Sequence, residues 1–395
     1  MQRPSRRVAG YFLGVIIAIW LAASPAGRAP ALAQGIFLEP PIPLTDFAEG
    51  ETYLGFMGGL YPGGLNQIPL DHVRAGLGPL AQIRPRDVDG NLSANGKVIL
   101  LSIGMSNTSR EFCGQGGDGH LATKCFAWSF IGQAGADLGI NHESLVILNG
   151  AQAGATDEEW TSTTGTAYTV IRESLFAGEV LSRAQVQVVW LKVAHRRPVT
   201  SLPSADADAY HLLAAMGDIV RTLKIEYPNL QIVFVSSRIY AGYATTDLNP
   251  EPYAYESGFA VKWLIESQIT QLRTGEISPL AGDLGLDVAP WLAWGPYLWA
   301  DGKTPRSDGL TWSPEDFDPE DLMHPGENAQ FKVAGMLMSF FKDSPFAQCW
   351  FLPDGDCADT ENEGPGSPAG NLIPAKPGQP VERCVQALRA GHCPE

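Results

Sequence analysis

The stretch KVILLSIGMSNTS, residues 97–109, indicates the fold of the chain. Its first seven residues form a short β-branched apolar run, which is typical of a strand buried on both faces. Gly104 then permits a tight turn, and Ser106 follows it. Four further apolar runs of similar length are predicted to be strands: SLVIL at 144–148, VQVVWLKV at 186–193, QIVFV at 231–235 and the stretch 292–299.

Amphipathic segments separate these runs, and each predicts a helix. They cover 126–138, 167–182, 208–226, 257–273 and 327–342. Continuous apolar strands that alternate with helices predict a parallel sheet with helices on both faces. We therefore expect an α/β fold, namely a three-layer α/β/α sandwich around a mostly parallel five-stranded sheet of the flavodoxin-like kind.

The N-terminus has the pattern of an export signal. Basic residues precede an apolar run at 9–23, and the small-x-small sequence at 31–33 offers a cleavage site before Gln34. We predict that residues 1–33 are a signal peptide and that the protein is secreted or periplasmic, without stable membrane insertion after cleavage. An uncleaved anchor is the alternative. Removing four arginines would take the net charge from −16 to −20, which disfavours nucleic acid as a partner.

The rest of the chain divides into three segments. Residues 34–95 are predicted to be an irregular lead-in packed on the main domain, residues 96–345 the main domain itself, and residues 346–395 a disulfide-containing tail with a Pro/Gly-rich linker. Six cysteines in an exported chain indicate disulfides, although they allow 15 connectivities. Their spacing favours the local pairs Cys113–Cys125, Cys349–Cys357 and Cys384–Cys393.

Two stretches carry residues suited to nucleophilic catalysis. Ser106 follows the first strand, where a helix N-terminus can stabilise an anion. Far along the chain, Asp321 and His324 form a D-x-x-H pattern in which the carboxylate can orient the imidazole as a base for the serine. A second copy, Asp208 to His211, opens a predicted helix and is interpreted as a capping residue followed by a histidine on the helix face.

These motifs together resemble those of the SGNH (GDSL-like) hydrolase family. GMSNT at 104–108 is similar to the family's nucleophile block, and DLMHP at 321–325 matches its D-x-x-H-P block. The stretch NGAQAGAT at 149–156 has the spacing of the block that supplies an oxyanion-binding glycine, which is Gly154 here. The resemblance spans residues 97–342 and implies a Ser106–His324–Asp321 triad, with the N–H groups of Ser106 and Gly154 binding the oxyanion.

The chain departs from the family at two places. Met105 replaces an aspartate that is not itself catalytic. After the third strand, Lys192-Val193-Ala194-His195 lacks the asparagine that the family places in the oxyanion hole, and one such donor typically contributes about 10²–10³ in rate. Gln152, Lys192 and His195 are the candidates to replace it. A structural His195 at the strand end is the alternative.

Aromatic residues gather just upstream of the D-x-x-H stretch. If exposed, Trp299 and Trp312, with Asp301 between them, would suit stacking on sugar rings, whereas core packing is the other interpretation. Arg238 and Tyr240 follow the fourth strand and are candidates for the same cleft, as are Lys192 and His195. We predict a carboxylic ester hydrolase acting on a small-molecule or polysaccharide ester, with an O-acetylated carbohydrate favoured, and no cofactor or metal. The alternative is a catalytically impaired protein of the same fold that binds glycan.

Overall fold

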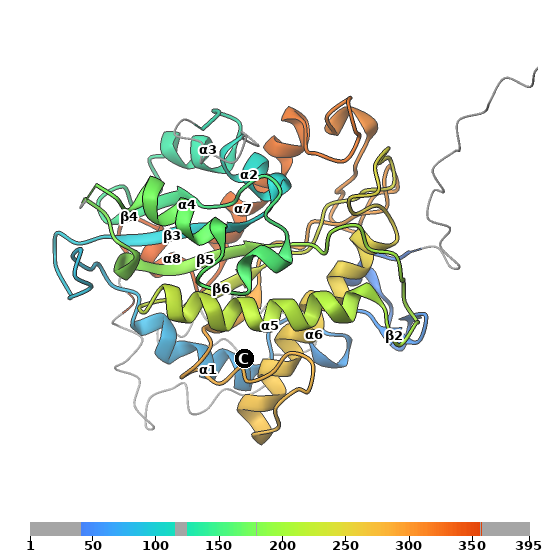
Figure 1. The fold of residues 1–395 in the computed structure, drawn as a ribbon, viewed down its shortest axis with the longest axis horizontal. Coiled ribbons are helices and arrows are strands. Elements are labelled where there is room, and N and C mark those ends of the chain that lie inside the picture. The colour runs from blue at the N-terminus through green and yellow to red at the C-terminus, as the bar shows by residue number, and fades with distance from the viewer. Residues whose placement is uncertain (1–40, 115–124, 179, 356, 358–395) are drawn as a thin grey trace, which may run out of the picture. The chain divides into compact units, whose positions relative to one another are not determined.

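The computed structural model describes residues 41–114, 125–178, 180–355 and 357 (Figure 1). The predicted signal peptide and the pair Cys384–Cys393 lie outside these residues. At its centre is a sheet of five parallel strands in the order β4-β3-β5-β6-β7. In chain order this is 2-1-3-4-5, the order of flavodoxin-like folds. The strands are β3 Val98–Gly104, β4 Leu145–Asn149, β5 Val186–Lys192, β6 Ile232–Val235 and β7 Trp291–Trp294.

Helices cover both faces of this sheet, as the alternating pattern predicted. Side chains such as Leu101 and Val189 pack on one face against α4 Thr166–Leu175, α5 Asp208–Glu226 and α6 Tyr253–Thr274. Side chains of opposite parity, such as Leu100 and Trp190, pack against α2 Ser106–Cys113, α3 Phe130–Ala136, α7 Glu327–Asp343 and α8 Gln348–Phe351. In Figure 1, α5 and α6 run beside each other on one face of the sheet. The predicted three-layer α/β/α fold is confirmed.

Several boundaries differ from the prediction. The fifth strand ends at Trp294 and not near residue 299, because Pro296 has no N–H with which to continue the pairing. The helix predicted at 126–138 is limited to α3, which Ser129 caps by accepting a hydrogen bond from the Gly132 N–H. The helix predicted at 167–182 ends at Leu175.

The segment predicted as an irregular lead-in contains regular structure. It forms a short hairpin, β1 Thr52–Tyr53 with β2 Phe56–Met57, and a twelve-residue helix, α1 Leu70–Ala81. Gly76, Gly78 and Pro79 weaken the helical signal of α1 in the sequence. Gly76 is nevertheless required by packing, because a Cβ there would lie 2.6 Å from the Trp291 ring. Tertiary contact with β7 therefore outweighs the poor local propensity of this helix.

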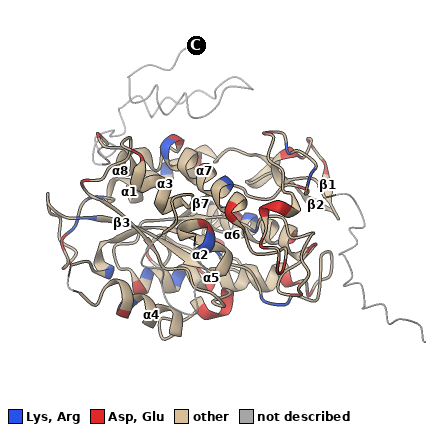
Figure 2. Ribbon diagram, turned by 90° about the horizontal axis from the view of Figure 1, so that it is seen from above, with Lys and Arg blue, Asp and Glu red and all other residues tan. Residues whose placement is uncertain are grey.

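Charged residues are spread over the described elements. In the view of Figure 2, acidic and basic positions both occur on several helices and loops. Among the described residues, the structure contains no helix that combines the length and the apolar character of a membrane span.

Candidate functional site

The carboxyl ends of β3, β4 and β5 meet at one edge of the sheet. Backbone hydrogen bonds join the loops that leave them: the Gln152 N–H donates to the Gly104 oxygen at 3.0 Å, and the Asp157 N–H to the Ala194 oxygen at 3.4 Å. Sites of doubly wound folds form at this edge because the loops converge there. The nucleophile block and the oxyanion block of the sequence are therefore adjacent.

The turn that carries Ser106 depends on Gly104. A Cβ at this position would lie 2.1 Å from the main-chain oxygen of Lys192, so no other residue fits. Directly after the turn, Ser106 becomes the first residue of α2. The Thr108 hydroxyl donates to the same Lys192 oxygen at 2.6 Å, which holds the first turn of α2 against the end of β5. Ser106 thus lies among the unpaired N–H groups of a helix N-terminus.

Ser106, His324 and Asp321 form one hydrogen-bonded chain. The Ser106 Oγ lies 2.8 Å from His324 Nε2, although 218 residues separate them in sequence. On the other side of the imidazole, Asp321 accepts a short hydrogen bond from His324 Nδ1. The second Asp321 oxygen accepts from the N–H groups of Met323 and His324, each at 3.0 Å. Burial raises the pKa of Asp321, but these hydrogen bonds outweigh it and hold the pKa well below its usual range.

Several contacts fix the loop around His324. Leu322 has a φ of +51°, which closes the turn between the acid and the base. The Asn107 amide donates to the Met323 oxygen at 3.2 Å, and Arg110 forms an ion pair with Asp318 at 2.7 Å. Both tie the loop to α2, which also carries Ser106. The relative position of the hydroxyl and the imidazole is therefore set by tertiary contacts as well as by their own hydrogen bond.

The oxyanion donors expected from the sequence differ in their availability. Gly154 is exposed and has a φ of +79°, with open space around it. Gln152 was predicted as a donor, and this prediction is wrong for its side chain. The Gln152 amide is buried and donates to the Gly150 and Ala167 oxygens at 3.2 and 2.9 Å, so it has no hydrogen left for a substrate.

Lys192 and Arg238 are not available to a substrate either. Lys192 is fully buried, and its ammonium pairs with both oxygens of Glu111 on α2. Burial lowers the pKa of Lys192 and raises that of Glu111, while the mutual attraction opposes both shifts. Arg238 is 1% exposed, and the carboxylates of Glu111, Glu251 and Asp321 partly offset the burial that lowers its pKa. Both cations are therefore enclosed in the protein interior and do not offer their charge to a bound substrate.

The expectation of an aromatic platform at Trp299 and Trp312 was wrong. Both side chains are fully buried, with their indole N–H groups bonded to Glu251 and to the Leu298 oxygen at 2.8 and 3.0 Å. They belong to the core. Tyr240 and Asp301 are each half-buried, and burial raises the pKa of both groups.

His195 stands at the end of β5 with a carboxylate on each side. Its Nδ1 bonds to Asp157 at 2.8 Å, and its Nε2 lies 3.6 Å from Asp208. The Asp157 hydrogen bond raises the pKa of His195. Of the three candidates for the missing oxyanion donor, it is the one with a partly exposed side chain, 25% by area. The second D-x-x-H copy opens α5, as predicted, and His211 pairs with exposed Asp206 at 3.1 Å. The interpretation of Asp208 as a helix cap is wrong, because its carboxylate accepts hydrogen bonds from the Val199 and Thr200 N–H groups instead of from the helix.

Sequence reasoning missed three residues that hold the site: Asn107, Glu111 and Asp157. The first two occupy ordinary helical positions, and Asp157 follows a glycine-rich loop. Their neighbours come from elements that are remote in sequence, so nothing local reveals them. Only Asn107, directly after the nucleophile, stood within a recognised motif.

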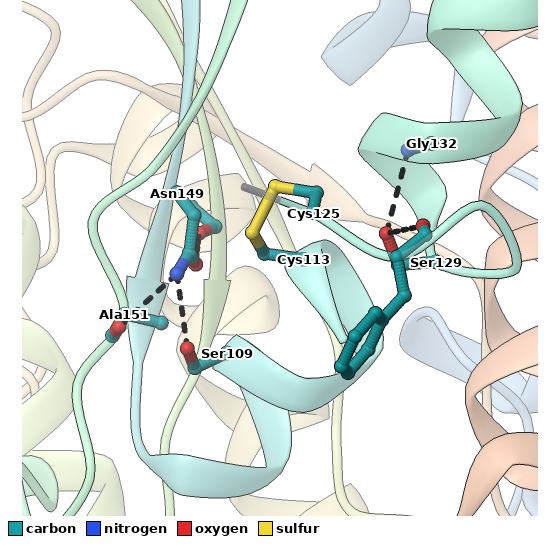
Figure 3. The surroundings of a disulfide bond; sticks show 9 residues. Ser109, Cys113, Cys125, Ser129, Gly132, Asn149 and Ala151 are labelled. Carbon is teal, nitrogen blue, oxygen red and sulfur yellow. Dashed lines mark hydrogen bonds between the residues drawn. A yellow bond between two sulfur atoms is a disulfide. The ribbon is translucent and has the colours of Figure 1, made fainter. Parts of the chain in front are cut away.

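Two predicted disulfides are present. Cys113–Cys125 closes the C-terminal end of α2, and Cys349–Cys357 links α8 to the chain that follows it. Figure 3 shows the first beside Asn149, whose amide donates to the Ser109 hydroxyl at 2.9 Å and to the Ala151 oxygen at 3.4 Å. The helix of Ser106 is therefore fixed at its far end as well. No group of three or more His, Cys, Asp or Glu suited to a metal occurs in the described part of the chain.

Comparisons with known proteins add the following. No family model matches the chain, and no curated protein does. Among solved structures, an extracellular lipase from Streptomyces rimosus matches at 14% identity over 62% of this chain and 99% of its own, with a TM-score of 0.32. An active-site mutant of a family two carbohydrate esterase from Clostridium thermocellum matches at 14%, over 62% and 64%, with a TM-score of 0.33.

An acetylxylan esterase from Geobacillus stearothermophilus, also a catalytic mutant, matches at 13% identity. It aligns over 62% of this chain and 94% of its own, with a TM-score of 0.31. The resemblance to SGNH hydrolases is confirmed for the fold. That conclusion follows from the strand order, from a serine directly after the first central strand and from D-x-x-H directly before the last long helix.

Proposed function

We propose that the protein is an exported serine esterase of the SGNH type, with Ser106 as nucleophile, His324 as general base and Asp321 as the group that orients the base. The observation that carries the proposal is the distance of 2.8 Å between Ser106 Oγ and His324 Nε2, combined with the bond from His324 Nδ1 to Asp321. A nucleophile within hydrogen-bond reach of an oriented base is the arrangement that acyl transfer requires.

In the first step, His324 Nε2 takes the hydroxyl proton while the Ser106 Oγ forms a bond to the ester carbonyl carbon. Asp321 stays ionised and stabilises the imidazolium that results, as its lowered pKa favours. The negative charge on the carbonyl oxygen is held by the N–H groups of Ser106 and Gly154. The carbon–oxygen bond to the alcohol then breaks, and the imidazolium gives its proton to the departing alcohol.

In the second step, water attacks the acyl group on Ser106. His324 takes a proton from this water and returns it to the Ser106 Oγ as the acid leaves. Each proton that His324 accepts is thus released within the same half-reaction, and the free enzyme is restored. No cofactor is needed for this balance.

The substrate class follows from export and from the setting of the site. An exported esterase meets extracellular polymers, and ester groups on polysaccharides are within its reach there. We propose that the substrate is a carbohydrate ester and that the acyl group is an O-acetyl group. The two disulfides among the described residues support an oxidising compartment.

The oxyanion site departs from that of the family, because Ala194 stands where the family has an asparagine. With Gln152 and Lys192 committed elsewhere, the N–H groups of Ser106 and Gly154 are the remaining donors, and His195 is a third. A site with fewer donors is expected to be slower than one with all of them, by about 10²–10³ for each one lost.

The test uses p-nitrophenyl acetate and the two D-x-x-H copies as matched sites. We expect Ser106→Ala and His324→Ala to lower kcat by roughly 10⁴–10⁶, whereas His211→Ala retains the parent rate. A parent protein that is folded yet inactive on this ester would overturn the esterase assignment and favour a glycan-binding protein of the same fold. Equal losses in His324→Ala and His211→Ala would overturn the assigned base.

A further inference from the structure

A hollow of about 340 Å³ lies beside the N-terminal part of α7. We call it the α7 groove. Its lining is Trp128, Asp316, Glu327, Asn328, Phe331 and Lys332. Phe331 is 60% exposed, although it lies in a helix whose other aromatic and aliphatic residues mostly face the core. Phe331 shares this hollow with the Trp128 ring, so that the two aromatic side chains together offer a concave apolar surface to a ligand.

The α7 groove is joined to the proposed catalytic site by a short series of contacts. Helix α7 begins at Glu327, three residues after His324. The Trp128 indole donates to Gln330 at 2.8 Å, and the Gln330 amide donates to the Pro325 oxygen at 2.9 Å. A ligand in the groove would therefore rest on the same structure that holds the imidazole.

The lining combines ring surfaces with hydrogen-bonding groups. Trp128 stacks on Phe126 with ring centroids 4.6 Å apart, which supports the indole from one side before any ligand arrives. Glu327 and Asn328 are exposed at the first turn of α7, facing the same hollow as Phe331. Aromatic faces beside planar polar groups match a sugar ring, whose C–H face is apolar and whose edge carries hydroxyls.

The charges of the groove favour a neutral sugar. Its only cation is Lys332, whose ammonium pairs with Asp316 at 2.7 Å and lies 5.3 Å from the centre of the Trp312 ring. Glu327 adds a second carboxylate without a second cation in the lining. A uronic acid ring would bring its own carboxylate toward these groups and would be repelled.

We propose that the α7 groove is a subsite for a neutral pyranose ring of an oligosaccharide, next to the ring whose ester reaches Ser106. The nature of the bond that is cleaved rests on the proposed function. Binding of a sugar in the α7 groove does not require that Ser106 be catalytically active. The aromatic residues that contact the sugar would then be Trp128 and Phe331, and not the buried Trp299 and Trp312. The substrate would then be a chain of at least two rings rather than a small ester.

The experiment measures binding by calorimetry in a Ser106→Ala background, with xylohexaose, cellohexaose and mannohexaose as neutral probes and hexagalacturonate as the charged one. We expect at least one neutral probe to bind and hexagalacturonate to bind more weakly. Phe331→Ala should weaken the neutral complex roughly tenfold. Ile225→Ala, which removes a 72% exposed side chain from α5, is the matched control and should bind as the parent does.

Because Phe331 is exposed, its replacement is not expected to impair folding. Trp128→Ala should act in the same direction, and Trp128→Phe should restore part of the affinity because it keeps an aromatic face. Absence of binding by all three neutral probes overturns the subsite, as does equal binding by Phe331→Ala and Ile225→Ala. Turnover of p-nitrophenyl acetate by the unmodified protein is unaffected by either outcome, so failure of the subsite is distinguishable from failure of the esterase assignment.

Discussion

The side-chain amide of Asn107 donates to the main-chain oxygen of Met323 at 3.2 Å, across 216 residues of sequence. Asn107 follows the proposed nucleophile, and Met323 precedes the proposed base. This hydrogen bond therefore joins the two segments whose relative position determines whether the proton can pass from Ser106 to His324. Both partners are buried, so water does not replace the bond when it is lost.

We expect Asn107→Ala to lower kcat by roughly tenfold to a hundredfold, because small displacements of reacting groups are costly, and to destabilise the fold by about 1–3 kcal/mol. Steady-state kinetics on p-nitrophenyl acetate and urea unfolding measure the two effects. Asn229→Ala is the matched control, since Asn229 makes the same kind of bond to the Ala184 oxygen at 2.7 Å away from the site. Equal kcat in both variants would show that the bond serves folding alone.

Asp321→Asn should retain the fold and lower kcat by about 10⁴. An amide at this position can present its N–H to His324 Nδ1, which favours the ring tautomer whose Nε2 carries the proton and cannot accept another. Circular dichroism checks the fold, and Asp206→Asn, in the exposed pair with His211, is the control. An Asp321→Asn enzyme that keeps parent turnover would contradict the role of Asp321.

The buried pair of Lys192 and Glu111 gives a stability prediction. Lys192→Met leaves the Glu111 charge buried without its partner and should cost about 3–5 kcal/mol, whereas Lys192→Met with Glu111→Leu should recover most of that loss. Chemical unfolding of the two variants decides this. For comparison, Arg197→Ala breaks an ion pair with Asp247 in which both side chains are more than half exposed, and should change stability by no more than about 1 kcal/mol.

Glu256 on α6 gives a pH prediction. Burial raises its pKa to about 8, against the hydrogen bonds that it accepts from the Leu202 N–H. The unfolded value is about 4.3. Between these two values the folded state holds more protons than the unfolded state, so stability falls as pH rises, with a slope of up to about 1.4 kcal/mol per pH unit.

Glu256→Gln has no proton to release and should lose this part of the pH dependence. Urea unfolding of the parent and the variant at several values between about pH 5 and pH 8 measures the difference. We expect the stability of the parent to fall more steeply than that of the variant from pH 5 to pH 8, so that the difference between the two curves shifts steadily in favour of the variant. Parallel curves would mean that Glu256 is ionised throughout this range.

Much of the sheet is predictable because each strand is a mostly apolar run and most helices are amphipathic, so both signals lie within a few consecutive residues. The encounter of Ser106 with His324 is predictable only because two short motifs resemble those of a known family. Helix α1 was missed because Gly76, Gly78 and Pro79 lower its propensity, while the contact with Trp291 that stabilises it is not visible in the sequence.

The aromatic residues show a different limit. Trp299 and Trp312 lie in a stretch where aromatic residues are interleaved with polar ones, as in a sugar-binding surface. The sequence alone does not distinguish a buried ring from an exposed one, and both rings are buried. Gln152 shows the same for polar groups, since its side-chain amide donates both of its hydrogens to carbonyl oxygens, that of Gly150 in its own loop and that of Ala167 in α4. Whether a side chain is free to contact a substrate depends on tertiary structure. The wrong predictions about the site concern side chains that the fold buries or engages in other hydrogen bonds.

The Cys113–Cys125 bond has a practical consequence for protein engineering. It brings the chain back to within 4.4 Å, measured between Cα atoms, at the end of the helix that begins with Ser106. The disulfide holds the two ends of any insertion between these cysteines at a fixed separation. The length of the insertion therefore need not change the position of α2 relative to the rest of the site. This position is therefore where we would graft a peptide tag or an additional binding module while keeping Ser106 in register with its partners.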